Sequence, residues 1–332
     1  MPVSSSDMSV CVVTVTYGQR AHLLDQVLTA SFACGVVRAV VVDNGSPADN
    51  QAALTALQDK FGTDRLHLVR LEENTGSAGG FHAALAHART LRDIRFLWIL
   101  DDDTVPQPST LSSLENTWRA FGSTDNTALM CFREDRRVYQ KALARKTLHG
   151  IEPDAFFDFN LAHLWNGGKR RARMEHGCLE LESAAYGGLW LARSWLDRIA
   201  LPPEHFHLYF DDYAFSLQIP EHGGQIWLCP DSPLRDIETS WQADRKTAHP
   251  WLTLATEDRR VFCTIRNRLW IERPRIRRPW LHTVNMVLYF LIKVLGTSLR
   301  YMLANIQKTP CFLRRFHLIW RALQQGRSSP LT

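Results

Sequence analysis

Three consecutive aspartates, Asp101 to Asp103, follow the apolar run Trp98-Ile99-Leu100 and would repel one another unless a cation or strong hydrogen-bond donors neutralised them. In an extended segment Asp101 and Asp103 point to the same side and Asp102 points to the other. Such a pair suits Mg²⁺ or Mn²⁺, which can also bridge the phosphates of a nucleotide diphosphate and stabilise that group as it departs. The alternative is a structural role, because Asp103 precedes Pro106 and a helical pattern and could cap that helix.

A second acidic pair, Asp211-Asp212, follows the aromatic run from Phe206 to Phe210. One carboxylate placed near a metal site is sufficient to remove the proton from an attacking hydroxyl group. The pair could instead cap a helix that the pattern predicts to begin near Asp211, since acids at a helix start are stabilised by the helix dipole. From the residues alone, both roles stay open.

The elements that position these acids alternate between short β-branched runs and helical patterns. We predict buried strands at residues 10–15, 39–42, 66–69 and 96–100, with helices between them. This order requires right-handed crossovers and a mostly parallel α/β sheet, whose ligands gather at the carboxyl ends of the strands. Polar or glycine-rich segments stand at all four of these ends, namely residues 14–17, 43–46, 74–80 and 101–103.

The later part of the chain has weaker patterns. Residues 133–173 mix charge, glycine and aromatic side chains without a clear period, which predicts inserted loops. Order resumes at residues 181–192, and a strand is expected at residues 225–229. We expect two domains, a catalytic domain over residues 1–250 and a helical basic region over residues 251–332.

The ordered set of motifs resembles the family 2 glycosyltransferases, particularly their galactofuranosyl- and rhamnosyltransferase-like branch. The resemblance spans roughly residues 10 to 240 and is carried by Thr14-Val15-Thr16-Tyr17, Val42-Asp43-Asn44-Gly45-Ser46, Asn74-Thr75-Gly76-Ser77-Ala78-Gly79-Gly80, Leu100 to Asp103 and Phe210-Asp211-Asp212. It implies the GT-A fold, a Rossmann-like, mostly parallel sheet flanked by helices. It also implies inverting, metal-dependent transfer of a sugar from a nucleotide-sugar donor.

On the donor side, the resemblance implies that Thr14 and Tyr17 lie beside the nucleotide base and that Asp43 accepts hydrogen bonds from the base or the ribose. As an alternative, residues 43–46 are simply good turn chemistry. In residues 74–80 the glycines permit close approach of the backbone to a ligand, and the following helix start favours negative charge. The donor-binding set is then Thr14, Tyr17, Asp43, Asn74, Gly76, Gly79 and Asp102.

On the acceptor side, the second acid of the pair acts as base in the family that the sequence resembles. The resemblance therefore assigns Asp212 as general base and Asp211 as a binder of the acceptor hydroxyl. Residues 187–190 resemble the segment that lines the acceptor pocket, which makes Gly188 and Trp190 candidates, although a tryptophan in an apolar run is commonly a core residue. Glu182 either binds a sugar hydroxyl or is a solvated surface acid.

One position departs from the family pattern, because relatives often carry a metal-binding histidine about two dozen residues beyond the base. Here that stretch reads Pro230 to Glu238, and Asp236 is the nearest candidate. We therefore expect Asp101, Asp103 and Asp236 to hold Mn²⁺ or Mg²⁺, for which an oxygen ligand is suitable. The histidines His222 and His249 are weaker substitutes, since a lone histidine is usually structural or exposed.

Charge divides the 332 residues into two parts. Residues 273–332 hold 11 Lys and Arg and no Asp or Glu, which leaves 28 basic and 34 acidic residues in 1–272. In the basic part an apolar stretch, residues 284–292, is broken by Lys293 and is too short to predict a spanning helix. It fits helices lying in an anionic membrane interface, or a buried helical cap with a solvated basic face.

The whole chain has ordinary globular composition, with 45% hydrophobic and 22% charged residues. Seven scattered cysteines without a C-x-x-C pair argue against a disulfide framework and a structural zinc site. No signal peptide pattern and no nucleic-acid-binding signature is found. We expect a cytoplasmic protein at the inner face of the membrane that binds a UDP- or dTDP-linked sugar and a glycan or lipid-linked saccharide acceptor. The rivals are a non-catalytic nucleotide-sugar or glycan-binding module and a nucleotidyltransferase.

Overall fold

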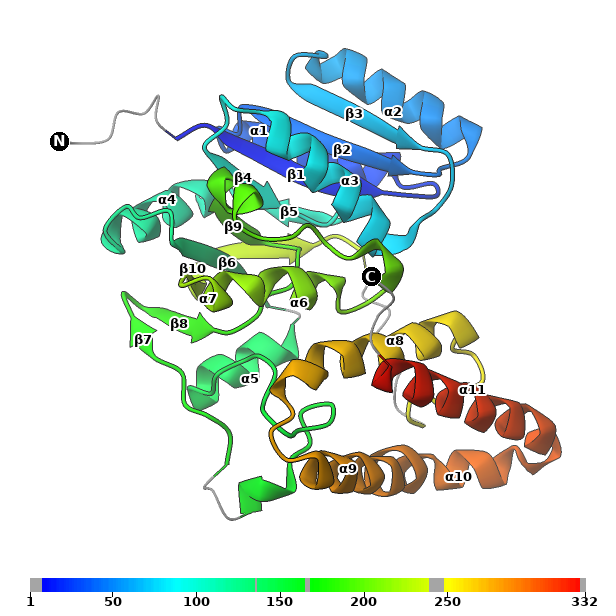
Figure 1. Cartoon of the computed structure of the whole chain (residues 1–332). Coiled ribbons are helices and arrows are strands. Elements are labelled where there is room, and N and C mark those ends of the chain that lie inside the picture. Colours follow the sequence, from blue (N-terminus) through cyan, green and yellow to red (C-terminus); the bar gives the residue numbers. More distant parts are fainter. Residues whose placement is uncertain (1–7, 135, 165–167, 239–247, 329–332) are drawn as a thin grey trace. The chain divides into compact units, whose positions relative to one another are not determined.

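The computed structural model describes residues 8–134, 136–164, 168–238 and 248–328 (Figure 1). The chain forms two compact units, and each is described by itself. Unit 1 comprises residues 1–150, 170–207 and 211–239, and unit 2 comprises residues 151–169, 208–210 and 240–332. We expected a single boundary between residues 250 and 251. In the structure, two earlier segments, 151–169 and 208–210, also belong to unit 2.

Unit 1 is built on one ten-stranded sheet (Figure 1). Its strands follow one another in the order β3-β2-β1-β4-β9-β6-β10-β8-β7, and β5 pairs with β10. The strands are β1 (Val10–Thr16), β2 (Arg38–Asn44), β3 (Leu66–Leu71), β4 (Phe96–Ile99), β5 (Thr104–Pro106), β6 (Thr127–Arg133), β7 (Met174–Glu175), β8 (Cys178–Leu181), β9 (Leu189–Ala192) and β10 (Gln225–Asp236).

The half of the sheet formed by β3, β2, β1 and β4 is parallel, as the sequence predicts. The predicted strands agree with the observed bounds to within two residues. Thr16 lies opposite Asp43 and Val13 lies opposite Ile99, so the carboxyl ends of β1, β2 and β4 meet at one edge. This edge brings together the polar segments that follow these strands.

The other half of the sheet is mixed. Strand β9 runs antiparallel between β4 and β6, and β10 runs parallel to β6. The pairing of β10 with β6 shifts between Cys229 and Pro233, after which β10 continues to Asp236 and pairs with β5. The strand predicted at 225–229 is therefore longer than expected. Because of this extension, Asp236 lies directly opposite Thr104.

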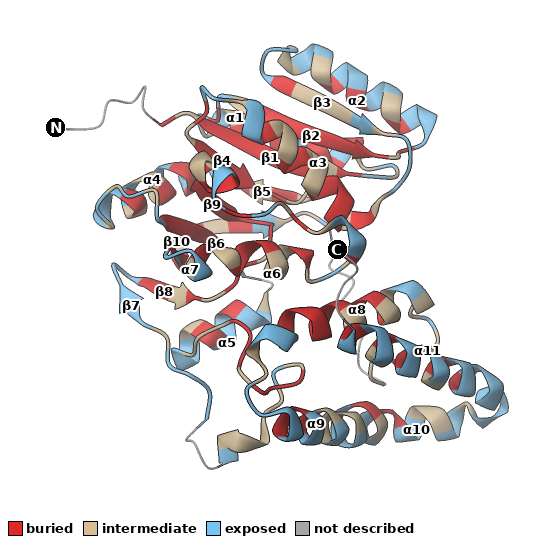
Figure 2. Ribbon diagram, viewed as in Figure 1, coloured by how far each residue is buried: buried red, intermediate tan, exposed pale blue. Residues whose placement is uncertain are grey.

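Helices cover the sheet of unit 1, and Figure 2 shows its strands as the most buried part. The helices are α1 (Ala21–Ala33), α2 (Ala48–Phe61), α3 (Gly76–Thr90), α4 (Thr110–Ala120), α5 (Arg137–Arg145), α6 (Asp211–Ser216) and α7 (Gln218–Glu221). Helices α1 and α2 contact each other, whereas α3 contacts α6. Right-handed crossovers place α3 on the opposite face from α1 and α2, because β4 lies on the other side of β1.

Large aromatic side chains fill the core between β4, β9 and α4. Trp190 is fully buried, and its ring stacks on Phe96 at a centroid distance of 4.1 Å with Trp118 at its edge. A side chain in this position offers no face to a sugar, so the expected role of Trp190 in acceptor binding is wrong. All seven cysteines are free, and five of them are buried.

Unit 2 is helical. It contains α8 (Asp258–Glu272), α9 (Pro279–Leu288), the π-helix η6 (Tyr289–Leu295), α10 (Gly296–Ala304) and α11 (Thr309–Arg327). Helix α11 packs along α8, and an apolar core includes Phe156, Trp251 and Ile319. The buried Arg268 pairs with Glu272 and with Asp158, which joins the inserted segment 151–169 to α8.

The stretch Pro279–Ala304 forms one continuous helical segment of 26 residues. By length and composition alone it could cross a membrane, although a charged residue, Lys293, interrupts it. Length therefore does not exclude a spanning helix, contrary to the sequence-based expectation. Only 17% of its most apolar window is buried.

Candidate functional site

One aspartate of β10 and one of the β4–β5 connection lie beside the same hydroxyl group. The Thr104 Oγ1 atom lies 3.4 Å from an oxygen of Asp103 and 3.4 Å from an oxygen of Asp236. The Ile237 amide donates to the Asp103 carbonyl at 2.9 Å, which fixes the end of β10 against this connection. The structure thus brings Asp236 to the aspartate cluster, where the sequence reasoning expected it.

A buried guanidinium group bridges two carboxylates of this cluster. Arg133 Nη1 lies 2.6 Å from Asp101 Oδ2, and Nη2 lies 2.6 Å from Asp236 Oδ2. The Arg133 side chain is only 3% exposed. Gly187 packs against this pair, and a methyl group there would overlap both Asp101 and Arg133. Arg133 therefore holds Asp101 and Asp236 in place by charge and by geometry.

A second arginine neutralises the other side of the cluster. Arg20 donates to both oxygens of Asp102 at 2.9–3.1 Å, contacts Asp103 at 3.1 Å and pairs with Glu238. Asp102 also accepts a 2.7 Å hydrogen bond from Thr16. Because its oxygens are bound by Arg20 and Thr16, Asp102 ties the cluster to the end of β1. Its expected role in donor binding stays a prediction.

The carboxylate oxygens of the cluster are of the type that a hard divalent cation binds, but among the residues that the structure describes they are not arranged as a three-ligand site. Burial, together with the charges of Asp101, Asp102 and Asp236, raises the pKa of Asp103 to about 6, so additional positive charge would stabilise this carboxylate. Carboxylate oxygens are the ligands that Mg²⁺ and Mn²⁺ prefer. Within the described part of the chain, no group of three His, Cys, Asp or Glu is arranged to hold a metal. Arg133 lies between two of the three carboxylates.

The Asp211-Asp212 pair begins α6, as the sequence predicts. Asp211 is buried and accepts a 2.9 Å hydrogen bond from the Ser77 hydroxyl at the start of α3. Burial raises the pKa of Asp211, and Ser77 partly offsets this. Burial and the charges of Asp211 and Asp101 raise the pKa of Asp212 well above its usual range. The charges of Asp211 and Asp101 thus both disfavour ionisation of Asp212.

Thr14 and Asp43 on the donor side each have a buried oxygen atom without a hydrogen bond in the part of the chain that the structure describes. Asp43 Oδ1 accepts a hydrogen bond from the Ser46 amide at 3.1 Å, but its Oδ2 atom and Thr14 Oγ1 have no partner among the described residues. Buried polar atoms are normally paired, so a bound ligand could satisfy these two. Tyr17 is 41% exposed, and the Arg20 guanidinium lies 5.6 Å from its ring centroid. The exposed ring is accessible to a nucleotide base.

The loop before α3 is held by side-chain amides. Asn44 accepts hydrogen bonds from the Thr75 amide and hydroxyl at 3.0 Å and donates to the Gly76 carbonyl at 2.9 Å. Asn74 accepts from the Gly76 amide at 2.9 Å. His207 occupies the space that a Cβ atom on Gly76 would need, and Thr75 occupies the corresponding space at Gly79. Packing within the protein therefore explains these two glycines without a ligand.

Replacing Gly76 by Ala is expected to destabilise unit 1 by about 3–5 kcal/mol. Gly76 has φ 77°, and a methyl group would overlap the backbone oxygen of His207. Gly62→Ala is the matched control, because Gly62 has φ 88° and open space around it, so it should cost only about 1–2 kcal/mol. Urea unfolding of both variants measures the difference; equal losses would contradict the importance of the His207 contact.

The remaining acceptor candidates do not form a group. The Glu182 carboxylate pairs with Arg170 at 2.7 Å. Gly188 has φ 114°, its amide donates to Ile99, and its carbonyl accepts from Cys131, so it belongs to the pairing of β4, β9 and β6. Its neighbour Gly187 is the glycine that contacts Asp101.

Sequence reasoning assigned no role to four residues of the site: Arg20, Arg133, Ser77 and Gly187. Arg133 is the last residue of β6, whose run Thr127–Arg133 was not recognised as a strand. Had it been, the rule that chemistry gathers at the carboxyl ends of strands would have pointed to Arg133. Ser77 and Gly187 stood within the segments 74–80 and 187–190 but received no role of their own, and Arg20 carried no signal, because its contacts join segments distant in the sequence.

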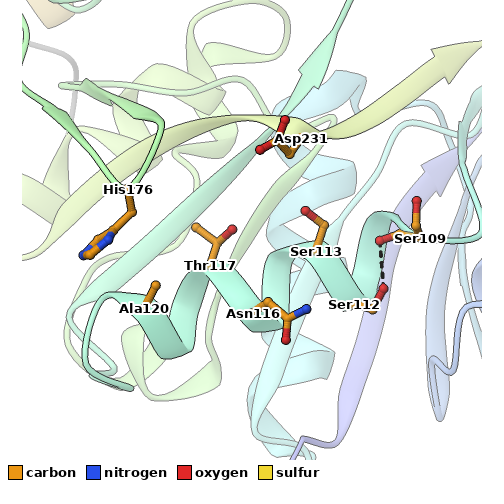
Figure 3. A pocket seen from close by; sticks show the side chains of 8 residues that line it. All are labelled: Ser109, Ser112, Ser113, Asn116, Thr117, Ala120, His176 and Asp231. Atoms are coloured by element: carbon orange, nitrogen blue, oxygen red, sulfur yellow. Dashed lines mark hydrogen bonds between the residues drawn. The ribbon is translucent and has the colours of Figure 1, made fainter.

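A hollow of about 460 Å³ lies beside α4, apart from the aspartate cluster (Figure 3). Small polar side chains of α4, together with His176 and Asp231, line it. None of these residues belongs to the aspartate cluster or to the Asp211-Asp212 pair. This hollow is therefore not part of the candidate site, which is defined by its acidic side chains.

The strand order, the crossover connections and the acids at the strand ends define an α/β protein of the GT-A glycosyltransferase class. Residues 11–173 match the family model described as Glycosyl transferase family 2. Residues 11–173 therefore carry a glycosyl transferase family 2 domain. A search of curated protein sequences gave no significant match.

Solved structures with a similar fold include the following three proteins. GalNAc-T7 with UDP, GalNAc and Mn²⁺ is 12% identical, with a TM-score of 0.53 over 80% of this chain and 48% of that one. The mannosyltransferase PcManGT from Pyrobaculum calidifontis, in complex with GDP-Man and Mn²⁺, is 17% identical, with a TM-score of 0.51 over 96% and 85%. S. aureus TarS 1-349 is 14% identical, with a TM-score of 0.51 over 95% and 81%. At these identities the likeness concerns the fold.

Proposed function

We propose that the protein is an inverting, metal-dependent transferase that moves a sugar from a nucleotide diphosphate sugar to a glycan acceptor. The observation that carries the proposal is the acid pair at the start of α6, where Asp211 accepts a 2.9 Å hydrogen bond from Ser77 of the glycine-rich loop and the pKa of the adjacent Asp212 is raised by burial. A base of raised pKa next to a site for a departing diphosphate is the arrangement that a single displacement requires. The Mn²⁺-bound complexes of GalNAc-T7 and PcManGT support the metal.

In the proposed mechanism, Asp211 and Asp212 act on the acceptor. Asp211, oriented by Ser77, accepts a hydrogen bond from a second hydroxyl group of the acceptor. Asp212 removes the proton of the attacking hydroxyl group as the oxygen of that hydroxyl bonds to the anomeric carbon and the bond from this carbon to the diphosphate breaks. The raised pKa makes Asp212 a stronger base than an ordinary aspartate, although it also requires a pH above that pKa.

On the donor side, Thr14, Tyr17 and Asp43 bind the nucleoside. The buried carboxylate oxygen of Asp43 accepts a hydrogen bond from it, and the buried hydroxyl group of Thr14 donates or accepts one. Asp101, Asp103 and Asp236 would hold Mn²⁺ or Mg²⁺, which supplies positive charge to the departing diphosphate. Arg133 and Arg20 keep these carboxylates from repelling one another. Each step therefore has a named group within unit 1.

For the sugar, we propose galactofuranose from UDP-galactofuranose, with rhamnose from dTDP-rhamnose as the nearest alternative. The support for both is the resemblance of the motif set to that branch of the family. The acceptor is proposed to be a lipid-linked cell-surface glycan, reached at the inner face of the membrane, since the cytoplasmic leaflet is anionic and residues 273–332 are basic.

One observation favours a second candidate, a nucleotide-sugar or glycan-binding module without turnover. Arg133 bridges Asp101 and Asp236, so these two carboxylates already have a cation between them. A protein that binds a donor with arginines alone would need no metal and no base. Such a module should bind donor equally well with or without a chelator.

The test is release of nucleoside diphosphate from a panel of nucleotide sugars, including UDP-galactofuranose and dTDP-rhamnose, with lipid-linked acceptors and either Mn²⁺ or EDTA. Turnover of one donor that EDTA abolishes is expected and would identify the sugar. Donor binding without turnover for any acceptor would favour the binding module. Turnover unaffected by EDTA would remove the metal from the mechanism.

A further inference from the structure

The helical segment 279–304 of unit 2 has polar side chains on its buried side. His282, Asn285 and Ser298 are buried there beside the apolar Leu281 and Val294, and large apolar side chains are exposed elsewhere on the segment. A helix on the surface of a globular protein usually exposes mainly polar side chains. The exposed apolar side chains therefore indicate that this face has a non-aqueous partner.

Specific hydrogen bonds hold the polar side of this segment against the rest of unit 2. Asn285 donates to the Asp154 carbonyl at 2.8 Å and accepts from the Leu161 amide at 2.8 Å. Ser298 accepts from the His249 amide at 3.0 Å. Because these contacts lie on two turns far apart, they fix which side of the segment faces the protein.

The exposed side carries a continuous apolar stripe. Its members are spaced mainly three, four or eight residues apart, which places them along one side of a helix. They are between 36% and 66% exposed, far more than the apolar residues of the core. The stripe consists of Trp280, Val284, Val287, Leu291, Leu299, Leu303 and Ile306.

The charge around the stripe is of one sign. Residues 273–332 contain 11 Lys and Arg and no Asp or Glu. Exposed basic residues stand before the stripe, within its length and just after it: Arg277, Arg278, Lys293, Arg300 and Lys308. A partner must therefore combine an apolar interior with negative charge at its surface, which describes a bilayer of anionic lipids.

We propose that the stripe of residues 280–306 lies in the interface of an anionic membrane, parallel to its surface. Two alternatives fit less well. The polar side of the segment forms hydrogen bonds with Asp154, Leu161 and His249. In a spanning helix, this side would face lipid and lose these partners. A second copy of the chain on the same face would bring two strongly basic surfaces together.

The experiment measures binding of the full chain to vesicles, without donor or acceptor, so its outcome does not depend on the proposed transfer reaction. The wild type is expected to float with vesicles of phosphatidylcholine and phosphatidylglycerol and to bind pure phosphatidylcholine about tenfold more weakly. The double variant Leu291→Glu/Leu299→Glu should bind the anionic vesicles at least about tenfold more weakly than the wild type. Both side chains are more than half exposed, so the fold should be kept.

Val37→Glu is the matched control, because Val37 is an exposed apolar residue of unit 1, 46% exposed, that receives the same charge. Its vesicle binding should equal that of the wild type. Equal binding by the double variant would overturn the proposal. So would failure of the wild type to bind anionic vesicles, a dimer that the double variant abolishes, or resistance of the bound protein to extraction at alkaline pH, which marks a spanning helix.

Discussion

Asp212→Asn is expected to lower kcat by about 10²–10⁴-fold while donor affinity stays within about twofold of the wild type. An amide has nearly the shape of a carboxylate but cannot accept the proton of the acceptor hydroxyl. Asp212 also accepts a 2.8 Å hydrogen bond from the Tyr213 amide, and the side-chain oxygen of Asn can still accept this bond. Steady-state kinetics together with calorimetric titration of the donor separate the two effects.

The pH profile gives Asp212 a second readout. Because burial and the neighbouring Asp211 raise its pKa, activity should fall on acidification at a higher pH than the value of about 4 typical of an aspartate. Glu221→Gln, in the neighbouring α7, is the control and should keep both the rate and this acid limb. Loss of donor binding in Asp212→Asn, or an unchanged kcat, would contradict the assignment of Asp212 as base.

Arg133→Gln is expected to reduce the free energy of unfolding of unit 1 by about 3–5 kcal/mol. The guanidinium is nearly inaccessible to water and lies 2.6 Å from both Asp101 and Asp236. A neutral side chain would leave two close carboxylates without their shared cation, and removing one partner of a buried ion pair is costly. Urea unfolding at neutral pH in the presence of EDTA measures this loss.

Arg119→Gln is the matched control for Arg133. Arg119 pairs with Glu115 at 3.6 Å on the surface of α4, where an ion pair contributes about 0.5 kcal/mol or less. Equal stability of the two variants would mean that Arg133 does not hold the cluster together. A gain of stability on adding Mn²⁺ to Arg133→Gln would show that a divalent cation can replace the guanidinium between the carboxylates.

Local pattern was sufficient to predict the parallel half of the sheet. Strands β1, β2 and β4 are buried on both faces, so their residues form short apolar runs that end where polar side chains begin. The rule for strand ends then located the aspartate cluster and the segment at Asp43. Asp236 was predicted in a different way, from its separation of about two dozen residues from Asp212 in the sequence. In the structure, β10 places Asp236 opposite Thr104.

The parts that pattern did not predict depend on contacts between distant segments. Trp190 lies in an apolar run that fits either a core strand or an acceptor pocket, and only its stacking on Phe96 decides between them. Segment 151–169 has no period of its own, because Arg268 and Asn285 hold it through charge and hydrogen bonds. Arg133 is a single basic residue in the sequence and becomes part of the site through Asp101 and Asp236.

The central claim is a single displacement in which Asp212 deprotonates the acceptor while the diphosphate leaves from the opposite face of the sugar. The anomeric configuration of the product tests it most directly and can be read by proton NMR once the donor panel has identified the sugar. The account predicts a configuration opposite to that of the donor. Retention of the donor configuration would contradict it, because retention would require a second step in which Asp212 is not simply a base.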